Sequence, residues 1–327
     1  MCPRLGPRVL RAAASVHPWL PLLLPECRTM AQARQELRWL TEQFGVRSAK
    51  LHRACALRSR HVPLQYILGS QPFGDLDIKC RKDVLIPRWE TEEWAMRLTE
   101  AMKEVLGGEK KHTRPWKVTD LCTGTGCIPL TILNETRETL KDPGLDIGAI
   151  DISPNAIQLT QENYKHNFPR DVRNPGNLQT PDNTQPPSSI NFNIQKLDIL
   201  DSSQVTKYTD KHLGVINILT CNPPYIPMQD FIKDVRSSVR VYEPKLALVA
   251  DLEFYENLVE VWIGQRLIES FVYELGNIEQ AEYVQKNVPP NWNVGVRYDS
   301  DQRPRCVYGY DSTAPHNYKH LFEIFAS

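Results

Sequence analysis

The 327-residue sequence lacks an excess of charge of either sign, because 39 lysine and arginine residues are balanced by 39 aspartate and glutamate residues. Without a net field to hold a polyanion, a protein that grips long nucleic acid is disfavoured, although a local basic groove is compatible with this balance. The sequence also lacks the run of about 20 apolar residues that spans a bilayer. We therefore expect no membrane segment and no stable nucleic-acid binding.

The eight cysteines lack the paired C-x-x-C spacing of a structural zinc site. Scattered cysteines of this kind are typical of reduced thiols in an intracellular protein. We expect no metal site.

Acidic residues are missing from the first 25 positions, which contain Arg4, Arg8 and Arg11. This composition is typical of a mitochondrial presequence, and three prolines interrupt the apolar run that a secretory signal would need. We expect residues 1–20 to be a mitochondrial leader. The alternative is that they form the basic end of the first folded helix.

Two small units are expected before the main domain. Apolar residues recur every three or four positions between Met30 and Arg60, which predicts two or three amphipathic helices in a helical domain of residues 21–63. Glycines then separate short apolar runs, starting at Tyr66 to Leu68, which predicts a β-hairpin connector within residues 64–92. The acidic residues after Pro87 are typical of a helix start, and we expect that helix to run to about Leu106.

Residues 93–327 alternate between apolar runs of strand length and helical segments, which predicts an α/β domain with a parallel sheet covered on both faces. An insertion at 167–189 contains five prolines and four asparagines and little apolar content. We interpret the insertion as a surface excursion, with a substrate-ordered flap as the alternative. The expected strands are Val118 to Leu121, Ile147 to Ile152, Phe192 to Leu197, Val215 to Thr220 and Phe271 to Leu275.

A glycine loop follows the first of these strands and precedes a helical run. Its glycines allow a sharp turn and the close approach of a ligand to a helix N-terminus. Asp151 ends the next strand, where an acidic residue can bind a ribose diol, and capping of the helix near Pro154 is the alternative role. Pro129 replaces the third glycine of a dinucleotide fingerprint. The loop consists of Asp120, Leu121, Cys122, Thr123, Gly124, Thr125 and Gly126.

The tetrapeptide Asn222-Pro223-Pro224-Tyr225 follows a buried-type strand and should face the same crevice as the glycine loop. The Asn222 side-chain oxygen and a main-chain carbonyl, that of Pro223 in our interpretation, can accept the two N–H groups of a planar NH2 group, with Tyr225 packing on it. An amide nitrogen is a poor nucleophile because its lone pair is delocalised. Accepting both protons returns electron density to nitrogen and predicts N-methyl transfer driven mainly by positioning.

These motifs together resemble the HemK/PrmC family of protein-(glutamine-N5) methyltransferases over nearly the whole chain after about residue 30. The similar segments are 63–69 (Pro-Leu-Gln-Tyr-Ile-Leu-Gly), 85–92 (Leu-Ile-Pro-Arg-Trp-Glu-Thr-Glu), the glycine loop, the tetrapeptide, 242–244 (Tyr-Glu-Pro), 274–276 (Glu-Leu-Gly) with Gln280, and 303–305 (Arg-Pro-Arg). The chain departs from the family pattern at Cys122 in place of the usual glycine, at Trp89 in place of the usual proline, at 249–251 (Val-Ala-Asp) in place of a glycine-rich turn, and before the 274–276 segment, where a Gly-Gly turn is missing.

The resemblance implies a Rossmann-like class I methyltransferase domain that uses S-adenosyl-L-methionine. Its substrate would be the glutamine of the Gly-Gly-Gln motif in a peptide chain release factor, and the enzyme would act as a monomer. A nucleic-acid N-methyltransferase and a non-catalytic partner-binding fold are the alternatives. The resemblance implies cofactor contacts from Cys122, Thr123, Gly124, Thr125, Gly126, Asp151, Asp198, Ile199 and Asn222, closure of the donor pocket by Glu90 and Thr91, substrate contacts from Asn222, Pro223, Pro224 and Tyr225, and catalytic roles for Asn222, Pro223 and Tyr225.

Overall fold

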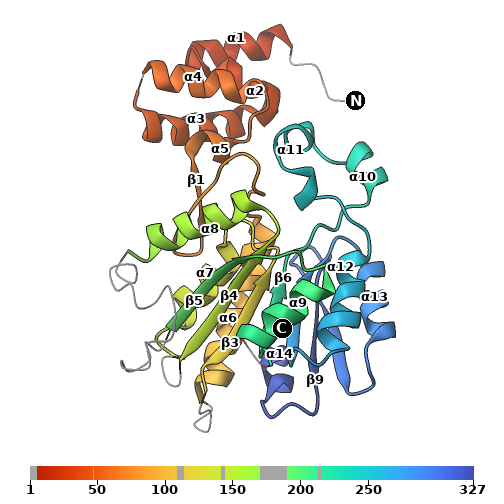
Figure 1. The fold of residues 1–327 in the computed structure, drawn as a ribbon. Coiled ribbons are helices and arrows are strands. Elements are labelled where there is room, and N and C mark those ends of the chain that lie inside the picture. Colours follow the sequence, from red (N-terminus) through yellow and green to blue (C-terminus); the bar gives the residue numbers. More distant parts are fainter. Residues whose placement is uncertain (1–5, 47, 109–113, 141–143, 170–189, 213–214) are drawn as a thin grey trace.

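The computed structural model describes residues 6–46, 48–108, 114–140, 144–169, 190–212 and 215–327. Figure 1 shows a bundle of helices beyond one end of a twisted sheet, with a two-stranded hairpin between them. Residues 170–189 of the expected insertion lie outside the described residues. Within the described ranges, every helix falls short of the length and apolar character that a membrane crossing requires.

Four helices form the N-terminal bundle around a small apolar core. The amphipathic helices predicted between Met30 and Arg60 are confirmed, and the hydroxyls of Thr29 and Ser48 cap their N-termini. Helix α1 adds the fully buried Ala13 to the same core, so a leader of residues 1–20, which stays a prediction, would include part of this bundle. The helices are α1 (Pro7–Val16), α2 (Leu20–Cys27), α3 (Met30–Phe44) and α4 (Ala49–Arg58).

The connector begins with a helical turn, α5 (Leu64–Leu68), and continues as the hairpin β1 (Ser70–Phe73) and β2 (Leu76–Lys79). The expectation of an extended chain at Tyr66 to Leu68 is therefore wrong. Gly69 adopts a left-handed conformation (φ 90°), and its N–H donates to the Gln65 carbonyl at 2.8 Å, which closes the turn. The apolar run was too short to distinguish a strand from a helical turn.

The main domain contains a seven-stranded sheet in the order β5-β4-β3-β6-β7-β9-β8. The five predicted strands are confirmed as parallel neighbours, although the fourth begins at Ile218 rather than Val215. Two antiparallel strands, which the sequence did not reveal, extend one edge. The strands are β3 (Trp116–Leu121), β4 (Leu145–Asp151), β5 (Ile190–Lys196), β6 (Ile218–Cys221), β7 (Ser270–Glu274), β8 (Trp292–Tyr298) and β9 (Pro304–Asp311).

Helices bury both faces of this sheet. Alternate side chains of one strand enter two separate cores: Val272 belongs to the core under α6, α7 and α14, and its neighbour Phe271 to the core under α9, α12 and α13. This arrangement confirms the predicted Rossmann-like architecture. The helices are α6 (Trp89–Val105), α7 (Cys127–Thr136), α8 (Pro154–Asn167), α9 (Ser202–His212), α10 (Met228–Lys233), α11 (Ser237–Tyr242), α12 (Glu253–Asn257), α13 (Ile278–Asn287) and α14 (Tyr318–Ala326), with short helical turns at η1 (Leu106–Gly108), η4 (Lys245–Ala247) and η5 (Leu258–Ile263).

Candidate active site

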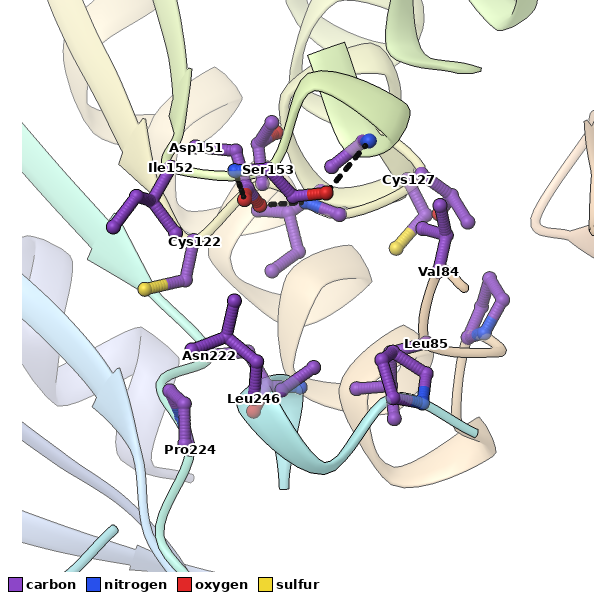
Figure 2. Close-up of a pocket in the computed structure, with 18 of the residues that line it drawn as sticks. Val84, Leu85, Cys122, Cys127, Asp151, Ile152, Ser153, Asn222, Pro224 and Leu246 are labelled. Atoms are coloured by element: carbon purple, nitrogen blue, oxygen red, sulfur yellow. Dashed lines mark hydrogen bonds between the residues drawn. The ribbon is translucent and has the colours of Figure 1, made fainter. Parts of the chain in front are cut away.

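A cavity lies at the carboxyl ends of β3, β4, β5 and β6, where the loops after four parallel strands meet. In Figure 2, Asp151 and Ser153 lie on one side of this cavity and Asn222, Pro224 and Leu246 on the other. Most of the residues predicted from the sequence line it. They are Cys122, Thr123, Gly124, Thr125, Asp151, Asp198, Ile199, Asn222 and Pro224.

Helix α8 holds the glycine loop in place. The Thr160 hydroxyl donates to the Gly124 carbonyl at 3.1 Å, and Asn163 Nδ2 donates to the Thr125 carbonyl at 2.8 Å. Gly126, the N-cap of α7, does not line the cavity. A Cβ at Gly126 would lie 2.7 Å from Thr160 Cγ2, so this glycine allows α8 to pack against the loop.

Cys122, the first residue of the glycine loop after β3, has a positive φ of 54°, a conformation that favours glycine. This explains why a glycine is usual at this position in the family that the sequence resembles. Cys122 lines the cavity and holds this left-handed conformation at the cost of local backbone strain.

Asp151 connects the glycine loop to the next strand. Its Oδ2 accepts from the Gly124 N–H at 2.9 Å and its Oδ1 from the Ser153 N–H at 2.8 Å. Burial raises the pKa of this carboxyl group, and these backbone N–H groups oppose the shift. The cap of α8 is Ser153, whose hydroxyl accepts from the Ala156 N–H, so Asp151 is not the helix cap that was its alternative interpretation.

Asp198 and Ile199 follow β5 and form another part of the wall. Asp198 is half-buried, and its Oδ1 accepts from the Leu200 N–H at 3.0 Å, which fixes the turn. Ile199 is buried and presents an apolar surface beside this carboxylate. A flat heteroaromatic group with polar edges matches this combination.

Two of the four residues of the tetrapeptide line the cavity, and the other two do not. Asn222 and Pro224 line the cavity, whereas Pro223 and Tyr225 do not. Asn222 Nδ2 donates to Thr91 Oγ1 at 3.1 Å, and the Tyr225 hydroxyl donates to Glu274 Oε1 at 3.1 Å. In this conformation the Tyr225 side chain therefore bonds a buried residue of the protein, and it does not lie in the cavity where it could pack on a substrate.

The segment before α6 forms another wall of the cavity. The sequence did not predict the residue that holds this segment in place, which is Glu243. Glu243 has a side chain only 1% exposed, accepts from the Ile86 N–H at 3.1 Å and pairs with Arg88 at 2.7 Å. Thr91 lines the cavity, as expected, whereas Glu90 instead pairs with Arg305 at 3.4 Å. The resemblance placed Arg88 and Glu243 in separate family segments but gave no sign that they meet.

Trp89, another departure from the family pattern, stands away from the cavity. Its side chain is 54% exposed at the start of α6, and it is not among the lining residues. In the part of the chain that the structure describes, no group of three or more His, Cys, Asp or Glu residues is arranged to hold a metal ion.

Comparison with curated proteins identifies similar sequences over almost the whole chain. The mitochondrial MRF1 N(5)-glutamine methyltransferase MTQ1 of Saccharomyces cerevisiae is 40% identical, over 99% of this chain and 94% of that protein. The probable MRF1 mitochondrial N(5)-glutamine methyltransferase of Schizosaccharomyces pombe is 33% identical, over 88% of this chain and 91% of that protein. A release factor glutamine methyltransferase of Bacillus cereus is 28% identical, over 76% of each chain.

None of the protein-family models matches the chain. Among solved structures, the hMettl16 catalytic domain in complex with MAT2A 3'UTR hairpin 6 superposes with a TM-score of 0.50 at 14% identity, over 81% of this chain and 84% of that one. This likeness supports the methyltransferase fold alone.

Proposed function

The chain belongs to the release factor N5-glutamine methyltransferase family, and we propose that it methylates the side-chain amide nitrogen of the glutamine in the Gly-Gly-Gln motif of a mitochondrial peptide chain release factor. The observation that carries this proposal is the position of Asn222. Its amide lies in the wall of the same cavity as the glycine loop and Asp151.

The residues around the cavity fit S-adenosyl-L-methionine as the methyl donor. The two Asp151 oxygens each accept one backbone N–H and keep lone pairs for the hydroxyls of a ribose. Asp198 and the apolar Ile199 suit an adenine, and Gly124 brings backbone close to a ligand without a Cβ. When bound, this cofactor supplies a methyl group on a positively charged sulfur.

The protein's own contribution is to bind and orient the amide of the substrate. We propose that Asn222 Oδ1, in the cavity wall, accepts one of its two N–H groups. The Pro223 carbonyl is the proposed acceptor of the other, although Pro223 does not line the cavity in this structure, so this second contact requires the bound substrate to reach past the cavity wall. With both N–H groups accepted, electron density returns to nitrogen and the lone pair points into the cavity. Pre-organised acceptors of this kind are worth about 3–4 kcal/mol each in enzymes, and orientation contributes about 7–11 kcal/mol in favourable cases. Pro224 adds a rigid wall beside them.

Mitochondrial action, the monomeric state and the absence of a nucleic-acid partner are parts of the same proposal. The basic, acid-free N-terminus and the mitochondrial names of the two yeast relatives support the location. The balanced total charge supports a protein rather than a nucleic-acid substrate.

The test is to incubate the purified chain with isotope-labelled S-adenosyl-L-methionine and mitochondrial release factors. We expect one methyl group per release factor, located by peptide fragmentation on the glutamine of the Gly-Gly-Gln motif. A release factor with alanine in place of that glutamine is the matched control and should remain unlabelled. Labelling of RNA, or of no substrate, would contradict the proposal.

A further inference from the structure

The carboxylate of Glu274 is buried next to the tetrapeptide and accepts three hydrogen bonds. Glu274 ends β7, next to the strand that leads to Asn222, and only 1% of the residue is exposed. Its Oε2 accepts from the Thr91 hydroxyl at 2.6 Å and from Trp94 Nε1 at 2.8 Å, and its Oε1 accepts from the Tyr225 hydroxyl at 3.1 Å. Burial raises the pKa of Glu274, and these three donors oppose the shift by stabilising the ionised form.

The donor and acceptor roles in this cluster follow from its chemistry. An indole nitrogen can only donate, so Trp94 requires an acceptor at Oε2. A hydroxyl has one hydrogen, and at 2.6 Å Thr91 gives that hydrogen to the same oxygen. The Thr91 oxygen can then only accept, and the group that it faces, at 3.1 Å, is the Asn222 amide. The NH2 side of that amide must face Thr91.

We propose that Glu274 and Thr91 act as positioning residues that fix which end of the Asn222 amide faces the substrate. With Nδ2 held by Thr91, Oδ1 is left on the cavity side as a hydrogen-bond acceptor. This inference rests on the proposed function, in which that oxygen accepts an N–H of the glutamine amide.

The reversed amide would be disfavoured by at least about tenfold, because Oδ1 would then face a Thr91 oxygen that has no hydrogen to offer. It would also present an NH2 group to the NH2 group of the substrate, and two donors cannot pair. The direction of one side-chain amide therefore decides whether the site accepts an amide nitrogen or repels it.

The first test measures the amide itself and needs no substrate. With asparagine side chains labelled with 15N, the signal that disappears in Asn222→Ala identifies Asn222. We expect its side-chain N–H to exchange with water at least tenfold faster in Thr91→Val, which keeps the shape of the side chain but lacks the hydroxyl, and at nearly the original rate in Thr91→Ser. Thr99→Val is the matched control, because Thr99 is also buried on the same helix and its hydroxyl donates to the Met96 carbonyl of that helix. Unchanged exchange in Thr91→Val would overturn the proposal.

The second test is kinetic. Thr91→Val should lower kcat by about 10- to 100-fold, with the KM for the release factor and the donor dissociation constant changed less than threefold. Thr91→Ser should recover most of the activity and Thr99→Val should lose none. Equal losses in Thr91→Ser and Thr91→Val would assign Thr91 a purely structural role.

A third measurement reports the direction of the amide. A release factor with glutamate in place of the motif glutamine presents acceptors only, which the Asn222 oxygen should repel. Its binding relative to the glutamine form should strengthen in Thr91→Val, because that change allows the amide to reverse. Glu274→Gln should lack this effect, because Trp94 still requires an acceptor and holds the oxygen of the new amide at the position of Oε2, where Thr91 continues to donate. Stronger binding of the glutamate form in Glu274→Gln but not in Thr91→Val would contradict the proposal.

The outcomes separate this proposal from the proposed function. If the unmodified chain labels no release factor, the proposed function fails, and the exchange measurement still decides whether Thr91 holds the amide. If the unmodified chain labels the glutamine but Thr91→Val retains full kcat and normal exchange, only the positioning role fails.

Discussion

Gly276 lies against the ring of Tyr225, and a Cβ on Gly276 would stand 2.7 Å from Tyr225 Cδ2. Gln280 fixes the same residue from another side, since its Nε2 donates to the Tyr225 carbonyl at 3.0 Å. The last residue of the tetrapeptide is thus held by the loop that follows β7 and by the first turn of α13. We expect the position of Asn222 in the cavity to depend on this support.

Gly276→Ala should push the Tyr225 ring aside and lower the rate of methyl transfer by about tenfold or more, because a shift of about 1 Å in a positioned group is costly. The donor dissociation constant should change little, since Tyr225 does not line the cavity. Single-turnover kinetics and donor calorimetry measure the two effects. Gly6→Ala, made in the full chain, is the matched control, because no described residue other than its chain neighbours lies within 4 Å of a Cβ there. Unaltered turnover in Gly276→Ala would show that the loop can move away.

Asn222→Ala should abolish methyl transfer, with a loss of about 100-fold or more, since it removes the proposed acceptor. The fold and the donor affinity should remain nearly intact. Asn287→Ala provides a control, because Asn287 is exposed on α13 and its side chain donates to the Tyr283 carbonyl of its own helix. Retained turnover in Asn222→Ala would refute the role assigned to this side chain.

Asp151→Ala should raise the dissociation constant of S-adenosyl-L-methionine at least tenfold, measured by calorimetry. The change removes the proposed ribose contact and releases the Gly124 N–H that Asp151 holds at 2.9 Å. Asp210→Ala, at an exposed position on α9, should leave the constant unaltered. An Asp151→Ala protein with normal donor affinity would reduce Asp151 to a structural residue.

Asp120 makes stability depend on pH. Burial raises the pKa of this carboxyl group to about 7, although Thr220 donates to its Oδ1 at 2.7 Å. The unfolded chain loses this proton near pH 4, so between about pH 4 and 7 the native state binds more protons and stability falls as pH rises.

Asp120→Asn should remove this dependence, because an amide does not ionise. The residue's contribution should make the unmodified protein about 2–3 kcal/mol less stable at pH 8 than at pH 5. Urea unfolding at both pH values measures this difference, with Asp210→Asn as the control. If Asp120→Asn leaves the pH dependence unchanged, Asp120 is ionised in the native state throughout this range.

The main features of the fold and site were predictable because their signals are local. Apolar runs of strand length predicted five parallel strands, and the carboxyl ends of such strands meet at one edge. The placement of Cys122, Asp151, Asp198 and Asn222 around one cavity follows from that rule. The one-turn helix at Tyr66 was missed because a segment of a single turn is too short to show the helical period of apolar residues.

The sequence by itself determined the five parallel strands, the glycine loop and the identity of the residues at the strand ends, since periodicity and glycine conformation act over a few neighbouring residues. Only the tertiary structure decided how those residues are held. The Arg88 and Glu243 pair joins positions 155 residues apart, and Thr91 meets Glu274 across 183 residues. Sequence periodicity does not reveal such contacts, because they form only when the first turn of α6 and the segment before it pack against residues distant in the sequence.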